Sequence, residues 1–406
     1  MDCKYIILVG DGMADYPIEE LNGKTPLQAA RTPHMDGLLA MGRMGMVRTI
    51  PDGMEPGSDV ANMSLLGYDP LRYHTGRAPL EAASMGIHLR PEEVAFRCNL
   101  VTLEKDAQGV VRMLDYSAGH ITTAESHELV GALQKAVEGT PLCLYPGVSY
   151  RHLLVWTDGR EDLQTTPPHD ISGEPATPHQ EVYRQEAVLL SFVEKAGGIL
   201  ADHPVNKQRI VAGKRPANAV WLWGQGRAPS MPTLKERYGL TGAMISAVDL
   251  LKGLGVYAGL EPIFVPGATG YLDTDYAGKV NAALNALETG DLVYVHIEAP
   301  DEAGHEGSLN KKIEAIEAFD EKVVGPILSE ISRFHKVRLL IETDHPTPIS
   351  IRTHATDPVP FLLVEDFERA KPAEASSAIF CEKMAEASGW NVESGVELFD
   401  YFIKGS

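Results

Sequence analysis

Residues 4–15 read KYIILVGDGMAD, an apolar run that stops at the turn Gly10-Asp11-Gly12. A short apolar segment bounded by glycines is typical of a buried strand that meets a flexible turn. We therefore expect Asp11 at the carboxyl end of a strand. Open parallel sheets bind ligands outside such strand ends, so this position favours a functional role.

The same layout returns twice in the second half of the chain. The apolar runs 292–297 and 337–341 are followed by the polar sequences DEAGH and Asp344-His345. Between them, residues 309–328 carry apolar side chains at helical spacing, and PVPFLLVED at 358–366 supplies a further strand. This alternation predicts a wound α/β sheet.

The middle of the chain has shorter apolar runs and several Pro and Gly breaks, such as TTPPHDISGEPATPH at 165–179. Connections of that length without structure of their own are uncommon, which disfavours the alternative of a long set of surface loops. We expect a smaller inserted domain at 96–215, between core segments 1–95 and 216–406. The segment ANAVWLWGQG at 217–226 is interpreted as the return to a buried strand.

The charge balance argues against a general affinity for nucleic acid or anionic membranes, because the 406 residues carry a net charge of -20. An anionic substrate must then be met by local cations or metals. The N-terminal apolar run is too short for a signal peptide, and no stretch reaches the roughly 18 apolar residues of a membrane span. With four widely spaced cysteines and no CxxC pair, these features predict a cytoplasmic protein with reduced thiols.

Carboxylates and imidazoles follow the predicted strands at spacings that suit metal ligands. Asp301 and His305 are four residues apart, so on a helical turn both side chains project from one face toward one ion. Taken alone, such a pair is more often a surface ion pair. Asp344 and His345 are adjacent and diverge, and His354 returns from a loop. Zinc, manganese and similar ions favour this mixed donor set.

Ser58 follows Pro56-Gly57 and precedes DVANMSLLGYDP, so we expect it at the start of a short helix. Its ordinary role there is that of the N-cap residue. The positive end of the helix also stabilises an anion formed on the serine oxygen. A serine nucleophile needs a base or a metal for activation, and no Gly-x-Ser-x-Gly motif surrounds Ser58, so a metal is the better activator.

Eight segments, spread between about residues 5 and 365, resemble the cofactor-independent phosphoglycerate mutases of the archaeal type, within the alkaline phosphatase superfamily. They are VGDGMAD, PGSDVANMSLLGYDP, TGRAPLEAA, YPGVSYRHLLV, WLWGQG, ISAVDLLKGLG, DEAGH and DHPTP with RTHATDPVPF. The family pattern often carries serine where this chain has Pro346. That departure leaves the candidate ligands themselves intact.

The resemblance implies an alkaline-phosphatase-like α/β core interrupted by one smaller α+β domain that closes over the substrate. It implies two divalent ions (Mn, Zn, Co or Mg) and no bisphosphoglycerate. By position, Asp301, His305 and His354 match the ligands of one ion, whereas Asp11, Ser58, Asp344 and His345 match those of the other. Ser58 matches the phosphorylated nucleophile.

Cationic side chains in the resembling segments are candidates for binding the substrate phosphate and carboxylate. Arginine suits bidentate contact with an oxyanion, and lysine supplies a point charge. For each candidate, an exposed and solvated cation is the alternative. The candidates are Arg151, His152, Arg227 and Lys252, with Arg77 and Arg215 as weaker ones.

The sequence therefore predicts a mutase that interconverts 3-phosphoglycerate and 2-phosphoglycerate through phosphorylated Ser58. The alternative is another metal-dependent phosphoryl-transfer enzyme, such as a phosphomonoesterase, a phosphopentomutase-like enzyme or the homoserine kinase proposed for some relatives. A third alternative is a metal-stabilised binding protein without turnover, which needs no activated serine. We expect a small phosphorylated substrate as the partner, no nucleic acid and no membrane, with homo-oligomer formation left open.

Overall fold

The computed structural model describes residues 3–367 and 378–405, and the chain divides into two compact units. The first unit combines Met1–His74 with Ser230–Ser406, and the second is Thr75–Pro229. The second unit is therefore one contiguous segment placed between two parts of the first. Each unit has a sheet and a core of its own, and we describe them in turn.

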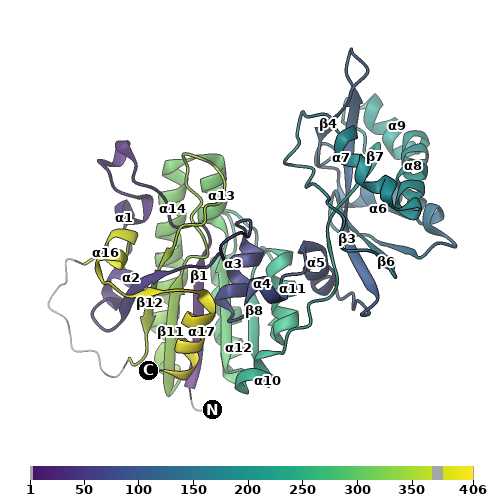
Figure 1. Ribbon diagram of the computed structural model, residues 1–406. Coiled ribbons are helices and arrows are strands. Elements are labelled where there is room, and N and C mark those ends of the chain that lie inside the picture. The colour runs from purple at the N-terminus through teal and green to yellow at the C-terminus, as the bar shows by residue number, and fades with distance from the viewer. Residues whose placement is uncertain (1–2, 368–377, 406) are drawn as a thin grey trace. The chain divides into compact units, whose positions relative to one another are not determined.

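The first unit is built on an eight-stranded sheet of order β13-β2-β12-β11-β1-β10-β8-β9. Strand β1 lies at its centre and pairs in parallel with β10 on one side and β11 on the other (Figure 1). Only β12 runs antiparallel to its neighbours β11 and β2. The strands are β1 (Cys3–Gly10), β2 (Arg43–Val47), β8 (Gly242–Ile245), β9 (Glu261–Pro262), β10 (Leu292–Ile297), β11 (Lys336–Glu342), β12 (Val359–Val364) and β13 (Asn391–Val392).

The central strands are apolar along their whole length because both faces of the sheet are covered. Every residue of β10 is buried, and so are the last six of β1. Helices cover the sheet, and apolar residues of α12 (Tyr276–Thr289), α14 (Leu309–Phe319) and α15 (Gly325–Glu330) join the main core. The α/β prediction for the core, including the strands at 292–297 and 337–341, is confirmed.

The remaining helices of the first unit are short and mostly connect strands. Between α14 and α15 the chain forms one π-helical turn, η3 (Asp320–Val324), without leaving the helix axis. The others are η1 (Glu19–Leu21), α1 (Pro26–Ala29), α2 (Pro33–Leu38), α3 (Ser58–Leu65), α4 (Pro70–Tyr73), α10 (Leu234–Tyr238), α11 (Asp249–Ala258), α13 (Ala299–Glu306), η4 (Ile331–Arg333), α16 (Glu382–Ala387) and α17 (Gly395–Lys404).

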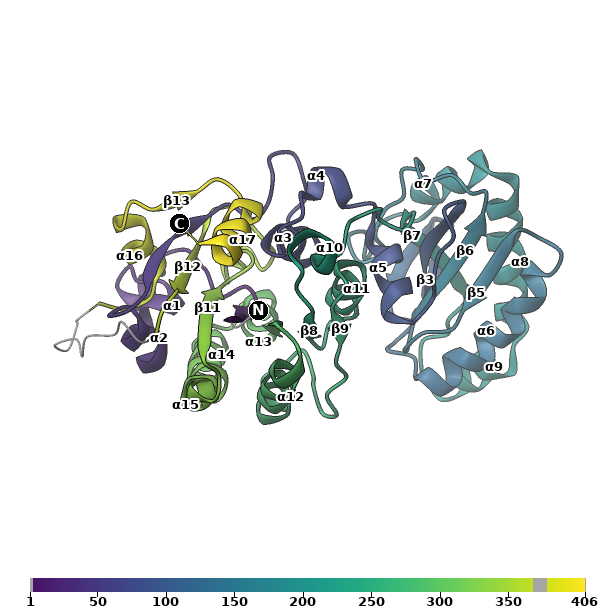
Figure 2. The same cartoon turned by 90° about the horizontal axis from the view of Figure 1, so that it is seen from below.

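The second unit has a five-stranded antiparallel sheet with the long strand β3 at its centre. Helices α6, α8 and α9 pack on one face and enclose the unit's largest core (Figure 2). Its strands are β3 (Glu93–Lys105), β4 (Val111–Asp115), β5 (Leu142–Tyr145), β6 (Arg151–Thr157) and β7 (Ala219–Gly226). Its helices are α5 (Arg77–Ser84), α6 (Thr123–Val137), α7 (Thr177–Gln180), η2 (Glu181–Gln185), α8 (Ala187–Asp202) and α9 (Pro204–Val211).

The boundaries of the second unit differ from the predicted 96 and 215. The unit starts earlier because helix α5 packs on β3 and β7, with Ala78 and Ala82 in one cluster with Ala95. It ends later because β7 pairs with β3. The segment ANAVWLWGQG does form a buried strand, but the strand belongs to the sheet of the second unit and not to that of the first.

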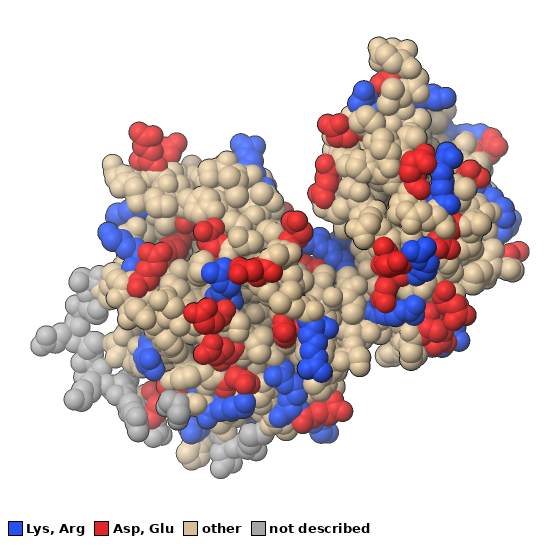
Figure 3. Space-filling view, viewed as in Figure 1, with Lys and Arg blue, Asp and Glu red and all other residues tan. Residues whose placement is uncertain are grey.

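On the face shown in Figure 3, acidic side chains are interspersed with Lys and Arg among the described residues. On that face the acidic side chains are scattered and form no single large patch. Within residues 3–367 and 378–405, no helix is long and apolar enough to cross a membrane.

Candidate active site

The site is built where three parallel strands end. Because β11, β1 and β10 lie side by side and run in the same direction, the chain leaves all three at one edge of the sheet. Asp11 directly follows β1, Asp344 lies two residues beyond β11, and helix α13 begins two residues beyond β10. Residues more than 300 positions apart in sequence are thereby brought together.

The first cluster consists of Asp301, His305 and His354. Asp301 and His305 lie one turn apart on α13, with Asp301 Oδ2 at 3.2 Å from His305 Nε2. His354 arrives from the loop after β11, and its Nε2 lies 3.0 Å from His305 Nε2 and 3.4 Å from Asp301 Oδ1. The prediction that DEAGH forms a helical turn with both side chains on one face is confirmed.

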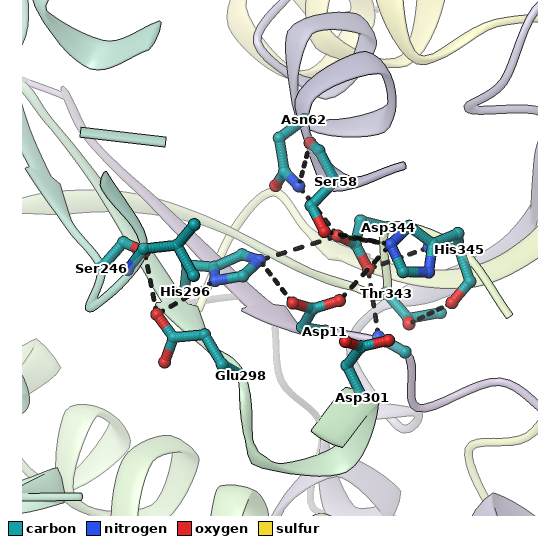
Figure 4. Close-up of polar contacts among 12 residues, drawn as sticks. Asp11, Ser58, Asn62, Ser246, His296, Glu298, Asp301, Thr343, Asp344 and His345 are labelled. Atoms are coloured by element: carbon teal, nitrogen blue, oxygen red, sulfur yellow. Dashed lines mark hydrogen bonds and ion pairs between the residues drawn. The ribbon is translucent and has the colours of Figure 1, made fainter. Parts of the chain in front are cut away.

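The second cluster consists of Asp11, Asp344 and His345, all nearly or fully buried. His345 Nε2 lies 3.6 Å from Asp11 Oδ1 and 3.5 Å from Asp344 Oδ2 (Figure 4). The hydroxyl oxygen of Ser58 lies 3.2 Å from the same His345 nitrogen, which adds a fourth donor. Each cluster therefore brings oxygen and nitrogen atoms within 4.8 Å of one another.

The two donor sets fit divalent ions in both spacing and chemistry. Donors bound at about 2.0–2.2 Å around a tetrahedral ion are separated from one another by about 3.3–3.6 Å, close to the distances above. Asp11 Oδ1 is also buried without a hydrogen-bond partner, although a buried carboxylate oxygen normally has one. A bound cation would satisfy this oxygen.

The pKa values of Asp11 and Asp344 shift in opposite directions. Burial, followed by the charges of Asp344 and Asp301, raises the pKa of Asp11 well above its usual value. Burial also opposes ionisation of Asp344, but the neighbouring His345 and His296 hold the pKa of Asp344 below its usual range. Two carboxylates this close cannot both ionise easily unless a positive charge lies between them.

Ser58 is the first residue of α3, and Gly57 occupies the N-cap position. The expectation that Ser58 lies at the start of a short helix is confirmed, whereas the alternative N-cap role of its side chain is wrong, because the hydroxyl points toward His345 (Figure 4). Asn62, one turn later, holds this arrangement: its Nδ2 donates to the Ser58 carbonyl and to Asp344 Oδ2, each at 2.8 Å. The Ser58 backbone and the Asp344 carboxylate are thus fixed by one amide.

Sequence reasoning missed several residues that surround the clusters. Tyr294 donates its hydroxyl to Asn62, and Thr347 donates its hydroxyl to Asp301. His296 lies between Asp11 and Glu298, and although burial opposes its protonation, contacts with Asp344 and Glu298 raise the pKa of His296 to about 9. A histidine inside the apolar run LVYVHI was the available signal for this last residue.

Two of the predicted substrate residues are held by contacts inside the second unit. The guanidinium of Arg227 donates to the carbonyls of Pro91 and Gly159. His152 is buried, its Nδ1 accepts the Gly147 N–H, and burial lowers the pKa of His152 to about 3. In this state the ring is neutral at ordinary pH.

The other candidates have different surroundings. Lys252 lies on α11 of the first unit, with Nζ 2.7 Å from Asp249 Oδ1. Arg215, a weaker candidate, pairs with Asp115 at 2.6 Å. Arg151 begins β6, where its guanidinium lies 5.9 Å from the centre of the Tyr150 ring.

Arg151 belongs to an arginine face, which we define as Arg77, Arg97 and Arg151 of the second unit. Arg97 projects from the same side of the sheet as Arg151, since Arg151 pairs with Asn99 two residues further along β3. The guanidinium carbon of Arg97 lies 4.1 Å from the centre of the Trp223 ring, and Arg97 Nη2 lies 2.9 Å from Glu81 Oε1. Burial lowers the pKa of Arg97, and the charges of Arg77 and Arg151 lower it further. Polar residues alternating with apolar ones in FRCNL were the missed signal.

Comparison with known proteins then places the chain among relatives. Residues 40–206 match the family model of 2,3-bisphosphoglycerate-independent phosphoglycerate mutase. A curated protein of that name from Methanothrix thermoacetophila is 54% identical, over 99% of this chain and 100% of the relative. The chain belongs to this family. A probable member from Geobacter sulfurreducens is 51% identical over 98% of this chain and 99% of its own length.

Solved structures agree with the family assignment. A protein from Pyrococcus horikoshii aligns with a TM-score of 0.80 at 29% identity, covering 99% of this chain and 98% of the other. A cofactor-independent phosphoglycerate mutase from Thermoplasma acidophilum aligns with a TM-score of 0.65 at 27% identity, covering 99% of both chains. The resemblance seen in the sequence motifs is confirmed, and the family fold extends over the whole chain.

Proposed function

We propose that this chain interconverts 3-phosphoglycerate and 2-phosphoglycerate through a phosphoserine at residue 58. The observation that carries the proposal is the position of the Ser58 hydroxyl, 3.2 Å from His345 Nε2 within a buried donor cluster. Family membership supplies the substrate class, since the curated relatives are named phosphoglycerate mutases.

We assign Asp11, Ser58, Asp344 and His345 to one divalent ion, and Asp301, His305 and His354 to a second. The ions, drawn from Mn, Zn, Co and Mg, would lower the pKa of the serine hydroxyl and polarise the substrate phosphate. Bisphosphoglycerate is not required, because the serine itself carries the phosphoryl group between the two hydroxyls of glycerate.

The transfer has two balanced steps. The Ser58 oxygen attacks phosphorus, the bond from phosphorus to the first glycerate oxygen breaks, and that oxygen gains a proton equivalent to the one lost by the serine. After glycerate turns, the oxygen of its other hydroxyl attacks the phosphorus of phosphoserine and the bond from phosphorus to the Ser58 oxygen breaks. That hydroxyl loses a proton, and Ser58 gains an equivalent one. The N-terminal end of α3 favours negative charge on the serine oxygen and on the phosphoryl group attached to it.

We assign binding of an anionic group of phosphoglycerate to the arginine face of the second unit. Arg97 pairs with Glu81 at 2.9 Å, the Nε of Arg97 is buried without a hydrogen-bond partner, and the charges of Arg77 and Arg151 act on the same guanidinium. Planar guanidinium groups suit carboxylate and phosphate oxygens. Water must be excluded during the phosphoserine stage, since hydrolysis would turn the mutase into a phosphatase.

The test is Ser58→Ala, with Ser64→Ala as a matched control. Both serines belong to α3, but Ser64 is buried at 1% exposure away from the donor clusters, against the C-terminal helix at Gly395. We expect the Ser58 variant to lose mutase activity and the control to keep it. Mass spectrometry of substrate-treated wild type should locate phosphate on Ser58.

Near-normal turnover by the Ser58 variant would refute the covalent route. Phosphate release or ATP-dependent transfer exceeding mutase turnover in metal-loaded wild type would favour a phosphatase or a kinase instead.

We place the enzyme in the cytoplasm, because its four cysteines are free thiols, as is usual in a reducing compartment.

A further inference from the structure

His296 is a fully buried histidine on β10 whose two ring nitrogens both face carboxylates. Its Nε2 lies 3.4 Å from Asp11 Oδ2 and 3.6 Å from Asp344 Oδ2. On the opposite side, its Nδ1 lies 3.4 Å from Glu298 Oε1 (Figure 4). Within the described residues neither nitrogen has a hydrogen-bond partner, and the three oxygens at these distances are all carboxylate acceptors.

Glu298, behind the ring, is held rigidly by several donors. Its Oε1 accepts the Ser246 hydroxyl at 2.9 Å and the Ala247 N–H at 2.6 Å. Its Oε2 pairs with Lys279 Nζ at 2.6 Å, and Lys279 also donates to the His296 carbonyl at 3.1 Å. These bonds restrain the Glu298 carboxylate, which lies beside the ring of His296.

The two aspartates in front of the ring differ in how much they depend on it. Asp344 accepts backbone N–H groups from Gly12 and His345, and its other oxygen accepts from Asn62. Asp11 Oδ1 has no hydrogen-bond partner, and Asp11 Oδ2 faces His296. Two ring nitrogens thus lie near the Asp11 carboxylate, His345 Nε2 at 3.6 Å from Oδ1 and His296 Nε2 at 3.4 Å from Oδ2. Because His345 is itself assigned as a ligand, His296 is the ring left to orient Asp11.

We propose that Lys279, Glu298 and His296 form an array that positions Asp11 for the divalent ion held with Ser58, Asp344 and His345. This inference rests on the proposed function, because it assumes that the cluster binds a metal ion. His296 is a positioning residue: it acts through Asp11 and touches neither substrate nor ion. Groups that orient metal ligands in this way commonly contribute ten- to hundredfold to metal affinity.

Burial of the array is costly, which argues against a purely packing role. Lys279 is fully buried and Glu298 almost so, at 0% and 2% exposure, and a buried ion pair is often no more stabilising than apolar side chains of the same volume. The charged pair lies behind the ring of His296, which faces Asp11 and is not one of the assigned ligands. Its placement is explained if the carboxylate of Glu298 fixes that ring.

The test compares His296→Gln with His296→Asn. Glutamine carries its amide donor about as far along the side chain as Nε2 and so still reaches Asp11. Asparagine carries its donor at the position of Nδ1 and reaches only Glu298. Both variants bury a neutral amide, so they differ mainly in which neighbour the amide reaches.

Metal-free protein is titrated with Mn²⁺ by calorimetry, with unfolding temperature measured alongside. We expect two ions in the wild type. His296→Asn should weaken one of them about ten- to hundredfold and leave the other unchanged, and His296→Gln should stay within about threefold of wild type. Arg338→Gln serves as a control, because Arg338 is a buried cation on β11 next to Tyr5, at the far end of β1 from Asp11.

Each outcome decides the inference. Equal affinities in wild type and in both variants would overturn it, and so would equal losses in the two variants or a loss matched by Arg338→Gln. If His296→Asn does not fold, Ser246→Ala removes one donor to Glu298, and it should weaken the same ion at least about threefold; no change there would also overturn it. A wild type that binds no Mn²⁺ would instead remove the proposed metal site, and the inference with it.

Discussion

The Arg151→Ala variant is expected to change substrate binding more than stability, because the Arg151 side chain makes a weak contact within the fold. Its guanidinium lies 5.9 Å from the centre of the Tyr150 ring, a contact worth about 0.5–1 kcal/mol at a partly exposed position. A charge-assisted contact with a carboxylate or phosphate is worth about 1.5–3 kcal/mol. We therefore expect kcat/KM for phosphoglycerate to fall about ten- to a hundredfold, with a smaller loss of stability.

The assay follows mutase turnover with a coupled enzyme and phosphate release in the same sample. Phosphate release should rise in the variant if the arginine also helps keep water from phosphoserine. Arg184→Ala is the matched control, because Arg184 is an exposed arginine of the second unit paired with the exposed Glu181. If kcat/KM of Arg151→Ala equals that of the control, the arginine face does not bind substrate, and the anion must be held by the first unit alone.

Three further outcomes are expected. Chelation should abolish activity, and added Mn²⁺ should restore it; full activity in a preparation free of metal by elemental analysis would contradict the assignment. Lys312→Met, which breaks a fully buried pair with Asp15 at 2.7 Å, should lower the free energy of unfolding by about 3–5 kcal/mol, whereas its neighbour Lys311→Met, at an exposed pair, should cost less than about 1 kcal/mol in denaturant titrations. The hydrogen bond to Asp301 raises the pKa of His305 to about 9 in the metal-free protein. The stability that this pair contributes is therefore complete below about pH 6.5 and is lost as the pH rises through 9. A urea midpoint that does not fall over this interval, or that falls equally in His305→Asn, would be inconsistent with that pair.

Much of the core and the donor set could be predicted because both depend on local patterns. A buried parallel strand is apolar along its length, so the apolar runs KYIILV and LVYVHI could be recognised as strands. The polar residues that follow each run lie at the edge where open parallel sheets usually bind ligands. The four-residue spacing of Asp301 and His305 likewise determines their common face once the helix forms.

The features that escaped prediction depend on pairing between distant segments. The strand at 219–226 could be recognised, but its partner β3 could not, and this pairing moves the unit boundary. Ser58 has the sequence of an N-cap, yet the nearby His345 draws its hydroxyl away from the helix backbone. Arg97 and His296 have roles set by neighbours from other strands, which spacing along the chain does not reveal.

The central place of β1 has a consequence for how the protein emerges from the ribosome. Both partners of this first strand, β10 and β11, follow it by about 280 residues or more. At a synthesis rate of about 5–20 residues per second, both edges of β1 stay unpaired for roughly 15–60 s before β10 is made. The second unit, being contiguous, has all its strands by residue 226 and need not wait. Asp11 can meet Asp344 only after residue 344 has been made, so the second donor cluster is assembled after the second unit, and shielding of the unpaired first strand until then is a task for the cell's chaperones.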